Sequence, residues 1–182
     1  MIRTIPFLLI ILIALGCSSG IQSEEQKPIN TLIYEEFGKE VYLPSFDGLE
    51  ISYVYVQYNS SGEPRSIDIQ YSTEMKDDVV EFFRNAENVK DWEEQFNAKK
   101  LYGPYEGDVV FILSVNNYPL GISGAKTIIN ETEVSIQDEN EVGFTIHSFT
   151  IDNEYSLAYN TNAFFKGDDI IDFTGDFLEN IK

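Results

Sequence analysis

The sequence predicts an α+β domain, built as an antiparallel sheet of six or seven strands with helices packed on one face. Three observations support this class. Short segments rich in β-branched and aromatic residues are separated by turn-forming residues, as in strands and hairpins. Residues 76–98 and 168–181 change to apolar residues spaced by three and four, which is typical of amphipathic helices. Four predicted strands towards the C-terminus follow one another through short turns, which indicates an antiparallel meander.

The N-terminal half predicts a short helix followed by a hairpin. Asn30 can cap a helix over residues 31–37, and Gly38 can end it. Residues 49–58 form an aromatic and β-branched strand, and residues 66–71 form a second strand in which apolar and polar residues alternate. The segment between them reads Asn-Ser-Ser-Gly-Glu-Pro, which is rich in turn formers, so the two strands are expected to pair.

Two helices are predicted next, over about residues 76–85 and 89–98, with one kinked helix as the alternative. Their aromatic stripe, which includes Phe82, Phe83 and Trp92, is interpreted as core rather than as a ligand site. The remaining strands are expected over residues 108–115, 125–129, 133–137, 143–150 and 155–159. A closing helix over residues 168–181, with Asp168 as its cap, should lie on the sheet.

The first 20 residues have the pattern of an export signal. Arg3 is followed by an unbroken apolar run of residues 5–15 and then by small residues around Cys17. A bilayer core of about 30 Å needs about 20 apolar residues as a helix, so this run is too short to span it. The leader therefore predicts secretion rather than a transmembrane anchor.

The end of the leader, Ala14-Leu15-Gly16-Cys17, resembles the lipobox of bacterial lipoproteins, although Ala14 and Leu15 stand in the opposite order from the usual one. The resemblance implies cleavage between Gly16 and Cys17 and a diacylglyceryl group on the Cys17 sulfur, with palmitate among the acyl chains. Two acyl chains hold a protein stably at a membrane, whereas one gives only marginal binding.

The predicted organisation is therefore a lipoprotein signal peptide over residues 1–16, a lipidated cysteine and flexible tether over 17–29, and a single extracytoplasmic domain over 30–182. The protein is expected at the cell membrane, on its outer side. Ser18 is not the Asp that resembles an inner-membrane retention signal. In a host with two membranes, the outer membrane is thus the expected location.

Composition limits the partners. The chain has 31 Asp and Glu against 12 Lys and Arg, which gives a formal net charge of −19. Such a charge repels nucleic acid and favours a cationic protein or peptide partner, although it can also serve only to keep a monomeric surface protein soluble. Cys17 is the sole cysteine, so the domain has no internal disulfide.

Few residues point to catalysis, a metal or a cofactor. His147 is the only histidine, which excludes motifs with two histidines, and Ser148 beside it should face the other side of the strand. His147 itself is expected to be half-buried or at the surface. Acidic residues gather in turns at 138–141, 152–154 and 168–169, but none has the spacing of an EF-hand loop. We therefore predict no catalytic residue, no metal ligand and no cofactor.

Tyrosines are the remaining group that could bind a ligand. They lie on the predicted first hairpin and last strand, and include Tyr53, Tyr55, Tyr58, Tyr71, Tyr155 and Tyr159. Aromatic rows on a sheet can bind glycans or peptides, because a tyrosine offers a flat apolar ring with a polar tip. Cross-strand packing explains the same pattern and is the favoured interpretation.

From Leu43 onward, the chain resembles an ectodomain family of unknown function found in bacterial surface lipoproteins and in anti-sigma factors. The resemblance rests on Leu43-Pro44 and Gly48 before a strand pair, on Gly124 before a strand, and on residues 152–159 before a terminal helix. It implies no catalytic residues. The predicted function is a non-enzymatic binding or accessory module of the cell envelope. The alternative is a hydrolase of envelope material that uses two converging carboxylates, at least one with a raised pKa.

Overall fold

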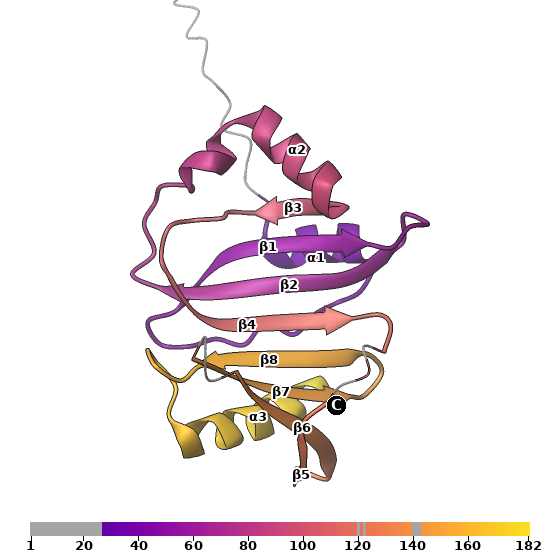
Figure 1. Cartoon of the computed structure of the whole chain (residues 1–182), viewed down its shortest axis with the longest axis vertical. Helices are drawn as coiled ribbons and strands as arrows, with labels where there is room; N and C mark the ends of the chain where they lie inside the picture. Colours follow the sequence, from indigo (N-terminus) through magenta and orange to yellow (C-terminus); the bar gives the residue numbers. More distant parts are fainter. Residues whose placement is uncertain (1–26, 120, 122, 140–142) are drawn as a thin grey trace, which may run out of the picture.

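A computed structural model of the chain describes residues 27–119, 121, 123–139 and 143–182 (Figure 1). The predicted cleavage site, Gly16-Cys17, lies outside these residues. The strands are β1 (Glu50–Tyr58), β2 (Pro64–Thr73), β3 (Ala98–Tyr102), β4 (Asp108–Asn116), β5 (Ala125–Ile129), β6 (Thr132–Glu139), β7 (Phe144–Thr150) and β8 (Glu154–Asn160). Within the described part of the chain they form one open antiparallel sheet in the order β3-β1-β2-β4-β8-β7-β6-β5, which confirms the α+β class.

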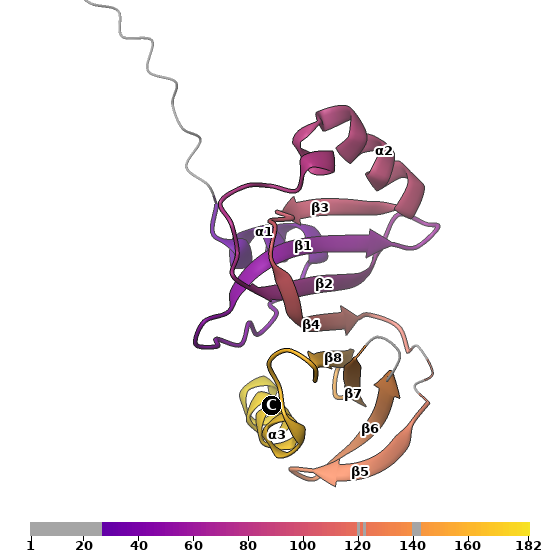
Figure 2. The same cartoon turned by 60° about the vertical axis from the view of Figure 1, so that its left-hand side comes forward.

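Three α-helices accompany this sheet in the described residues: α1 (Ile29–Phe37), α2 (Ala86–Phe96) and α3 (Gly167–Ile181). The helices α1 and α3 lie on the same side of the sheet, where β6 and β5 curl round α3 (Figure 2). None of the helices in the described ranges has the length and apolar character needed to cross a membrane.

The prediction that all helices share one face is wrong for α2. Trp92 of α2 packs against Tyr53 and Tyr55, which point to one side of β1. Val54 and Val56 point to the other side and join Ile33 of α1 in the core. Because side chains alternate along a strand, α2 covers the face opposite to α1, at the β3 end of the sheet.

In the described part of the chain the sheet has eight strands rather than the expected six or seven, because β3 was not predicted and the helix expected to reach residue 98 ends at Phe96. Asn97 takes a left-handed conformation with φ of 47° and ends α2 there. The chain then reverses, and Ala98 pairs with Gln57 of β1. The β3 segment, Ala-Lys-Lys-Leu-Tyr, carries weak strand preferences, so its pairing depends on the exposed edge of β1.

The helix predicted over residues 76–85 is also wrong, because only a 3-10 turn, Glu81–Arg84, forms there. Asn85 follows in an extended conformation, and its side chain accepts a hydrogen bond of 2.8 Å from the backbone N–H of Glu87. An asparagine that bonds the backbone in this way favours a helix start over a helix interior.

Two predicted caps are corrected. The residue at the N-cap position of α1 is Pro28 rather than Asn30, and α3 begins at Gly167 with Lys166 before it. Gly38 does end α1, as predicted, with φ of 79° and its N–H bonded to the carbonyl of Tyr34.

The core lies between the sheet and the α1–α3 side, and its centre is aromatic. Phe46, in the segment that joins α1 to β1, stacks on Phe173 of α3 with ring centroids 4.7 Å apart. The same ring meets Phe111 of β4 edge-on at 5.1 Å. Phe111 is fully buried and also contacts Tyr159 of β8. Phe46 thus links the helix, the connecting segment and the middle of the sheet.

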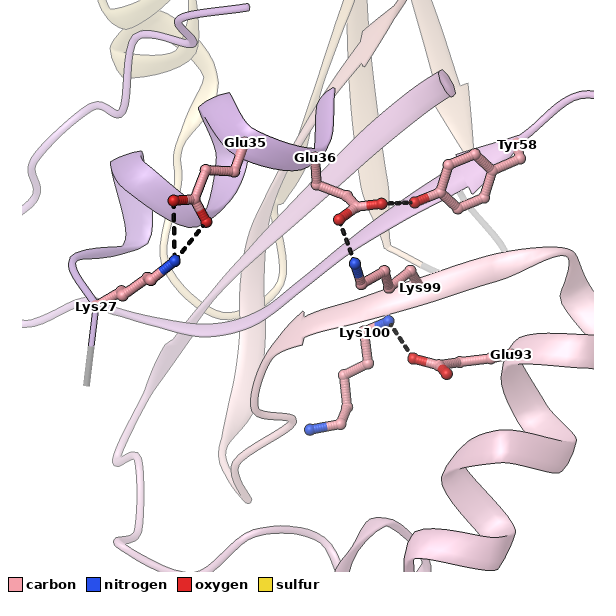
Figure 3. A network of polar contacts seen from close by, with 7 residues as sticks. All are labelled: Lys27, Glu35, Glu36, Tyr58, Glu93, Lys99 and Lys100. Atoms are coloured by element: carbon pink, nitrogen blue, oxygen red, sulfur yellow. Dashed lines mark hydrogen bonds and ion pairs between the residues drawn. The ribbon is translucent and has the colours of Figure 1, made fainter. Parts of the chain in front are cut away.

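Polar contacts hold α1 and α2 to opposite sides of the β3 edge (Figure 3). Glu36 of α1 accepts hydrogen bonds from Tyr58 of β1 and from Lys99 of β3. Partial burial opposes ionisation of Glu36, but these two hydrogen bonds and the charge of Lys99 together lower its pKa. On the other side, the backbone N–H of Lys100 donates to Glu93 of α2 at 2.9 Å. Two consecutive β3 residues, Lys99 and Lys100, therefore bind α1 and α2 respectively.

Candidate functional site

A continuous row of polar side chains crosses the sheet on the face opposite to α1 and α3. Direct register partners on adjacent strands point to the same face. Followed from β3 to β5, the row is Lys100, Tyr55, Asp68, Ser114, Ser156, Ser148, Ser135 and Lys126. We call it the serine row. Each strand contributes one member, so the row runs across the strands from one sheet edge to the other.

Strand alternation explains why the row is polar. On β2, Asp68 lies between Ile67 and Ile69, which are fully buried in the core. On β8, Ser156 lies beside Leu157, which is also fully buried. With a period of two, burial of one set of side chains forces the other set to the second face. The residues of the serine row thus alternate along their strands with the residues that form the core.

A hollow of about 300 Å³ lies over the β1–β8 part of the row. It is lined by Tyr55, Gln57, Arg65, Ser66, Asp68, Ser114, Asn116 and Ser156. Asp68 accepts a hydrogen bond from the hydroxyl of Ser114, and Tyr55 also hydrogen-bonds to its carboxylate. Burial raises the pKa of Asp68, although these two hydrogen bonds favour the carboxylate and oppose the rise.

Asn116 is a second buried polar residue in the wall of this hollow. Its side chain is only 5% exposed, and its Nδ2 atom has no hydrogen-bond partner among the described residues. A buried polar donor left unpaired costs about 1–3 kcal/mol, and most such groups in native proteins are paired. Asn116 is one of the residues that line the hollow, so this unpaired donor belongs to the wall of the hollow.

A second hollow, of about 360 Å³, continues the groove towards β5. Ser148 and Ser135 lie in its lining, together with Lys126 and Glu133, which form an ion pair of 2.5 Å. The hydroxyls of Ser148 and Ser156 are 3.0 Å apart and join the two hollows. We call the two hollows together the polar groove.

An aromatic cluster borders the polar groove at its β3 end. Trp92 meets Tyr55 edge-on at 5.6 Å and Phe83 at 5.6 Å. The prediction that this stripe is core is wrong, because α2 has no buried residue, and Phe82 and Phe96 are 47% and 49% exposed. The α2 segment lies over the sheet edge rather than inside the domain, so its aromatic side chains keep an accessible flank.

The tyrosines divide between the two faces. Tyr71 and Tyr159 are buried in the core, and Tyr155 packs against it, which confirms the packing interpretation for these three. Tyr53 and Tyr55 lie on the polar face and also pack on Trp92. Of these two, Tyr55 lines the groove.

His147 does not belong to the groove. Its side chain is 2% exposed, so the prediction of a half-buried or surface position is wrong, because α3 packs over it through Thr174. His147 Nδ1 lies 2.7 Å from Thr174 Oγ1, which also contacts the Tyr159 hydroxyl at 2.8 Å and donates to the Ile170 carbonyl at 2.8 Å. Burial lowers the pKa of His147 to about 4, and the charge of Asp138 opposes this shift only in part.

Other predicted features do not form a site. Ser148 faces away from His147, as expected, because it lies in the serine row. The described residues include no group of three or more His, Cys, Asp or Glu side chains arranged to hold a metal ion.

The groove residues were not found from the sequence because their serines are scattered over five strands. The available signal was a serine at an outward position of β4, β6, β7 and β8.

We expect replacement of Asp68 with asparagine to leave the domain at least as stable as before at neutral pH. Burial disfavours the charged carboxylate, whereas an asparagine Oδ1 can still accept from Ser114 and Tyr55. Because the folded-state pKa is raised, the native protein takes up a proton before the unfolded chain does, and the gain should shrink as the pH falls.

Urea unfolding at neutral and mildly acidic pH measures this effect. Asp172→Asn is the matched control, since Asp172 is exposed on α3 and its replacement should change little. A clear loss of stability in Asp68→Asn at neutral pH would show that the carboxylate is structural.

The fold and groove define a class of protein, namely an α+β open-sheet domain with its core on one face and a polar groove on the other. Comparison with protein-family models, curated proteins and solved structures gives no match.

Proposed function

We propose that this protein is a non-catalytic binding module, held outside the cytoplasmic membrane by lipid on Cys17, and that the polar groove is its ligand surface. The observation that carries the binding function is the buried, unpaired Nδ2 atom of Asn116 beside Asp68 in the groove. The lipobox resemblance at Gly16-Cys17 supports the anchor, and the tether predicted over residues 17–29 would join the lipid to the domain.

Binding is favoured over hydrolysis by the arrangement of carboxylates. A hydrolase of the predicted kind needs two acidic side chains in one pocket. Among the described residues, Asp68 is the one carboxylate that lines the first hollow. The second hollow is lined by Glu154 and by Glu133, and the charge of Glu133 is paired with Lys126. The hydroxyl and amide groups around Asp68 suit recognition of a polar ligand without a reaction.

The groove is less suited to a cationic protein or peptide, the partner class predicted from net charge. Lys100 and Lys126 stand at the two ends of the serine row, and Arg65 lies at the first hollow. Lys126 is paired with Glu133, but Lys100 and Arg65 would repel a cationic chain at the β3 end and at the first hollow. The net charge of −19 then serves solubility and a monomeric state.

We expect replacement of Cys17 with alanine to release the protein from membranes. Without a thiol, no diacylglyceryl group can be attached, and the chain loses the two acyl chains that hold it. In native cells grown with radioactive fatty acid, the unaltered protein should label and sediment with membranes, and Cys17→Ala should do neither. Ser18→Ala is the matched control and should behave like the unaltered protein. Labelled, membrane-bound Cys17→Ala would refute the anchor.

The binding function is tested with the lipidated protein in detergent micelles and insoluble envelope material from its own host. The protein should sediment with this material, and Ser156→Trp, which fills the first hollow, should not. Equal sedimentation of both forms would place binding elsewhere. Release of soluble fragments from the envelope material would support the hydrolase instead.

A further inference from the structure

We propose that the polar groove binds an uncharged sugar chain, rich in hydroxyl and amide groups, that lies across the strands along the serine row. This inference rests on the proposed function and specifies the chemical class of its ligand. It is drawn from the mixture of donors and acceptors in the groove, the length of the row, its charges and the aromatic cluster at one end.

The groove offers donors and acceptors in close alternation. Asn116 contributes an unpaired amide N–H to the wall, and Asp68 presents a carboxylate. The Ser114 hydroxyl donates to Asp68 and can still accept, and the Ser156 hydroxyl shares a hydrogen bond with Ser148. A ligand that only donates or only accepts could pair with one kind of these groups but not with the other. Sugar hydroxyls, which also donate and accept, can satisfy both kinds, and an acetamido group can accept from Asn116 Nδ2.

The length of the row favours a chain over a single sugar. From Tyr55 to Ser135 the row crosses six strands, β1, β2, β4, β8, β7 and β6. Adjacent strands lie about 4.8 Å apart, so this distance is roughly 24 Å. The hydrogen bond between Ser148 and Ser156 keeps the floor continuous where the two hollows meet. An extended ligand can therefore lie over both.

Charge and shape exclude other ligand classes. A phosphate-rich or nucleic-acid ligand would approach Asp68 in a protein of net charge −19 and be repelled. A lipid tail would desolvate the serine hydroxyls without bonding them. A peptide needs pockets for apolar anchor side chains, or a sheet edge for its backbone, and the row provides neither because it crosses the strand faces.

The aromatic cluster suits one end of a sugar chain. Tyr55 belongs both to the serine row and to the cluster, where its ring meets Trp92 at 5.6 Å. Trp92 also contacts Phe96, which is half exposed. An aromatic ring can pack on the apolar C–H face of a sugar while its polar tip stays hydrogen-bonded. The ligand would thus lie with one end against α2 and the rest over the serines.

The test uses the lipidated full-length protein in detergent micelles and a set of defined oligosaccharides. Neutral oligomers of N-acetylglucosamine, glucose and xylose are the probes, and an oligomer of a uronic acid is the anionic comparison. Calorimetry should detect binding of at least one neutral oligomer, with weaker binding of its monomer and of the uronate.

Three variants locate the site. Ser156→Trp should raise the Kd more than tenfold, equivalent to about 1.4 kcal/mol, because the indole occupies the hollow. Asn116→Leu, which removes the amide donor, should weaken binding to acetamido sugars most. Thr127→Trp is the matched control, since Thr127 is exposed on β5 and alternates with Lys126 of the row; its affinity should not change. Thermal unfolding verifies that each variant is folded.

Two results would overturn the sugar assignment. One is the absence of binding to every neutral oligomer, and the other is equal binding by Ser156→Trp and the unaltered protein. If neutral oligomers fail while envelope material still binds and Ser156→Trp abolishes that binding, the groove is a binding site for another chemical class. In that case the proposed function stands and the sugar assignment does not.

Discussion

Replacement of Phe111 with alanine is expected to lower the free energy of unfolding by about 3–5 kcal/mol, the usual cost of removing a buried phenylalanine ring. Phe111 is fully buried on β4 and contacts Phe46, Tyr71 and Tyr159 at centroid distances of 5.1, 5.4 and 5.3 Å. These partners come from the α1–β1 connection and from both neighbouring strands. They cannot collapse into the vacated space without moving the sheet.

Urea or thermal unfolding measures this loss. Domain stabilities are typically 5–15 kcal/mol, so the change is a large fraction of the total and should lower Tm by roughly 10 °C. Phe82→Ala is the matched control, because the same ring is removed from a side chain that is 47% exposed. A similar loss in both variants would show that Phe46 and its neighbours do not form the centre of the core.

We expect the free energy of unfolding to fall by about 3 kcal/mol, because of His147 alone, as the pH drops from above 6.5 to about 4. Burial beneath α3 lowers the folded-state pKa to about 4, whereas the unfolded chain titrates near 6.5. Between these values the unfolded state binds a proton that the folded state does not, so stability rises with pH. Well above pH 6.5 the imidazole is neutral in both states, so His147 no longer makes the free energy of unfolding depend on pH.

Because His147 is the only histidine, a comparison with one variant isolates its contribution to the pH dependence. Urea unfolding across the window should give a steeper pH dependence for the unaltered protein than for His147→Gln, since all carboxylates are common to both. The difference in slope isolates the histidine even if the variant is less stable at every pH. An NMR titration of the single imidazole should give a midpoint near 4. A midpoint near 6.5 would show that the ring is accessible to solvent.

Local patterns predicted most of the elements. The alternation of Ile67 and Ile69 with Asp68 identified β2, and the turn formers after Tyr58 identified its pairing with β1. The apolar spacing in residues 168–181 located α3 within one residue of its start. These signals worked because the period of a strand or helix is set by the chain's own geometry and recurs over several residues.

Elements whose conformation depends on distant partners were missed. The β3 segment has weak strand preferences of its own and becomes a strand because the β1 edge supplies its hydrogen bonds. The 3-10 turn at Glu81–Arg84 replaces a helix because Asn85 begins α2 instead. His147 was placed near the surface because a strand pattern does not show which side a later helix, α3, will cover.

The candidate site was less predictable than the fold. The sequence shows Ser114, Ser148 and Ser156 at outward positions of separate strands, but nothing local shows that they are neighbours. That fact depends on strand order and register, in which β8 inserts between β4 and β7. The unpaired amide of Asn116 likewise exists only once the surrounding strands have buried it.

Periodicity along the chain therefore predicts the α+β class, the hairpin and most strands, and the leader supports the export and lipidation proposal at Cys17. The folded chain shows four further features: the strand order, the place of α2, the burial of His147, and serines from five strands brought together in one groove. The physical reason is that periodicity is a property of neighbouring residues, whereas a site on a sheet face is made by register between segments far apart in the chain.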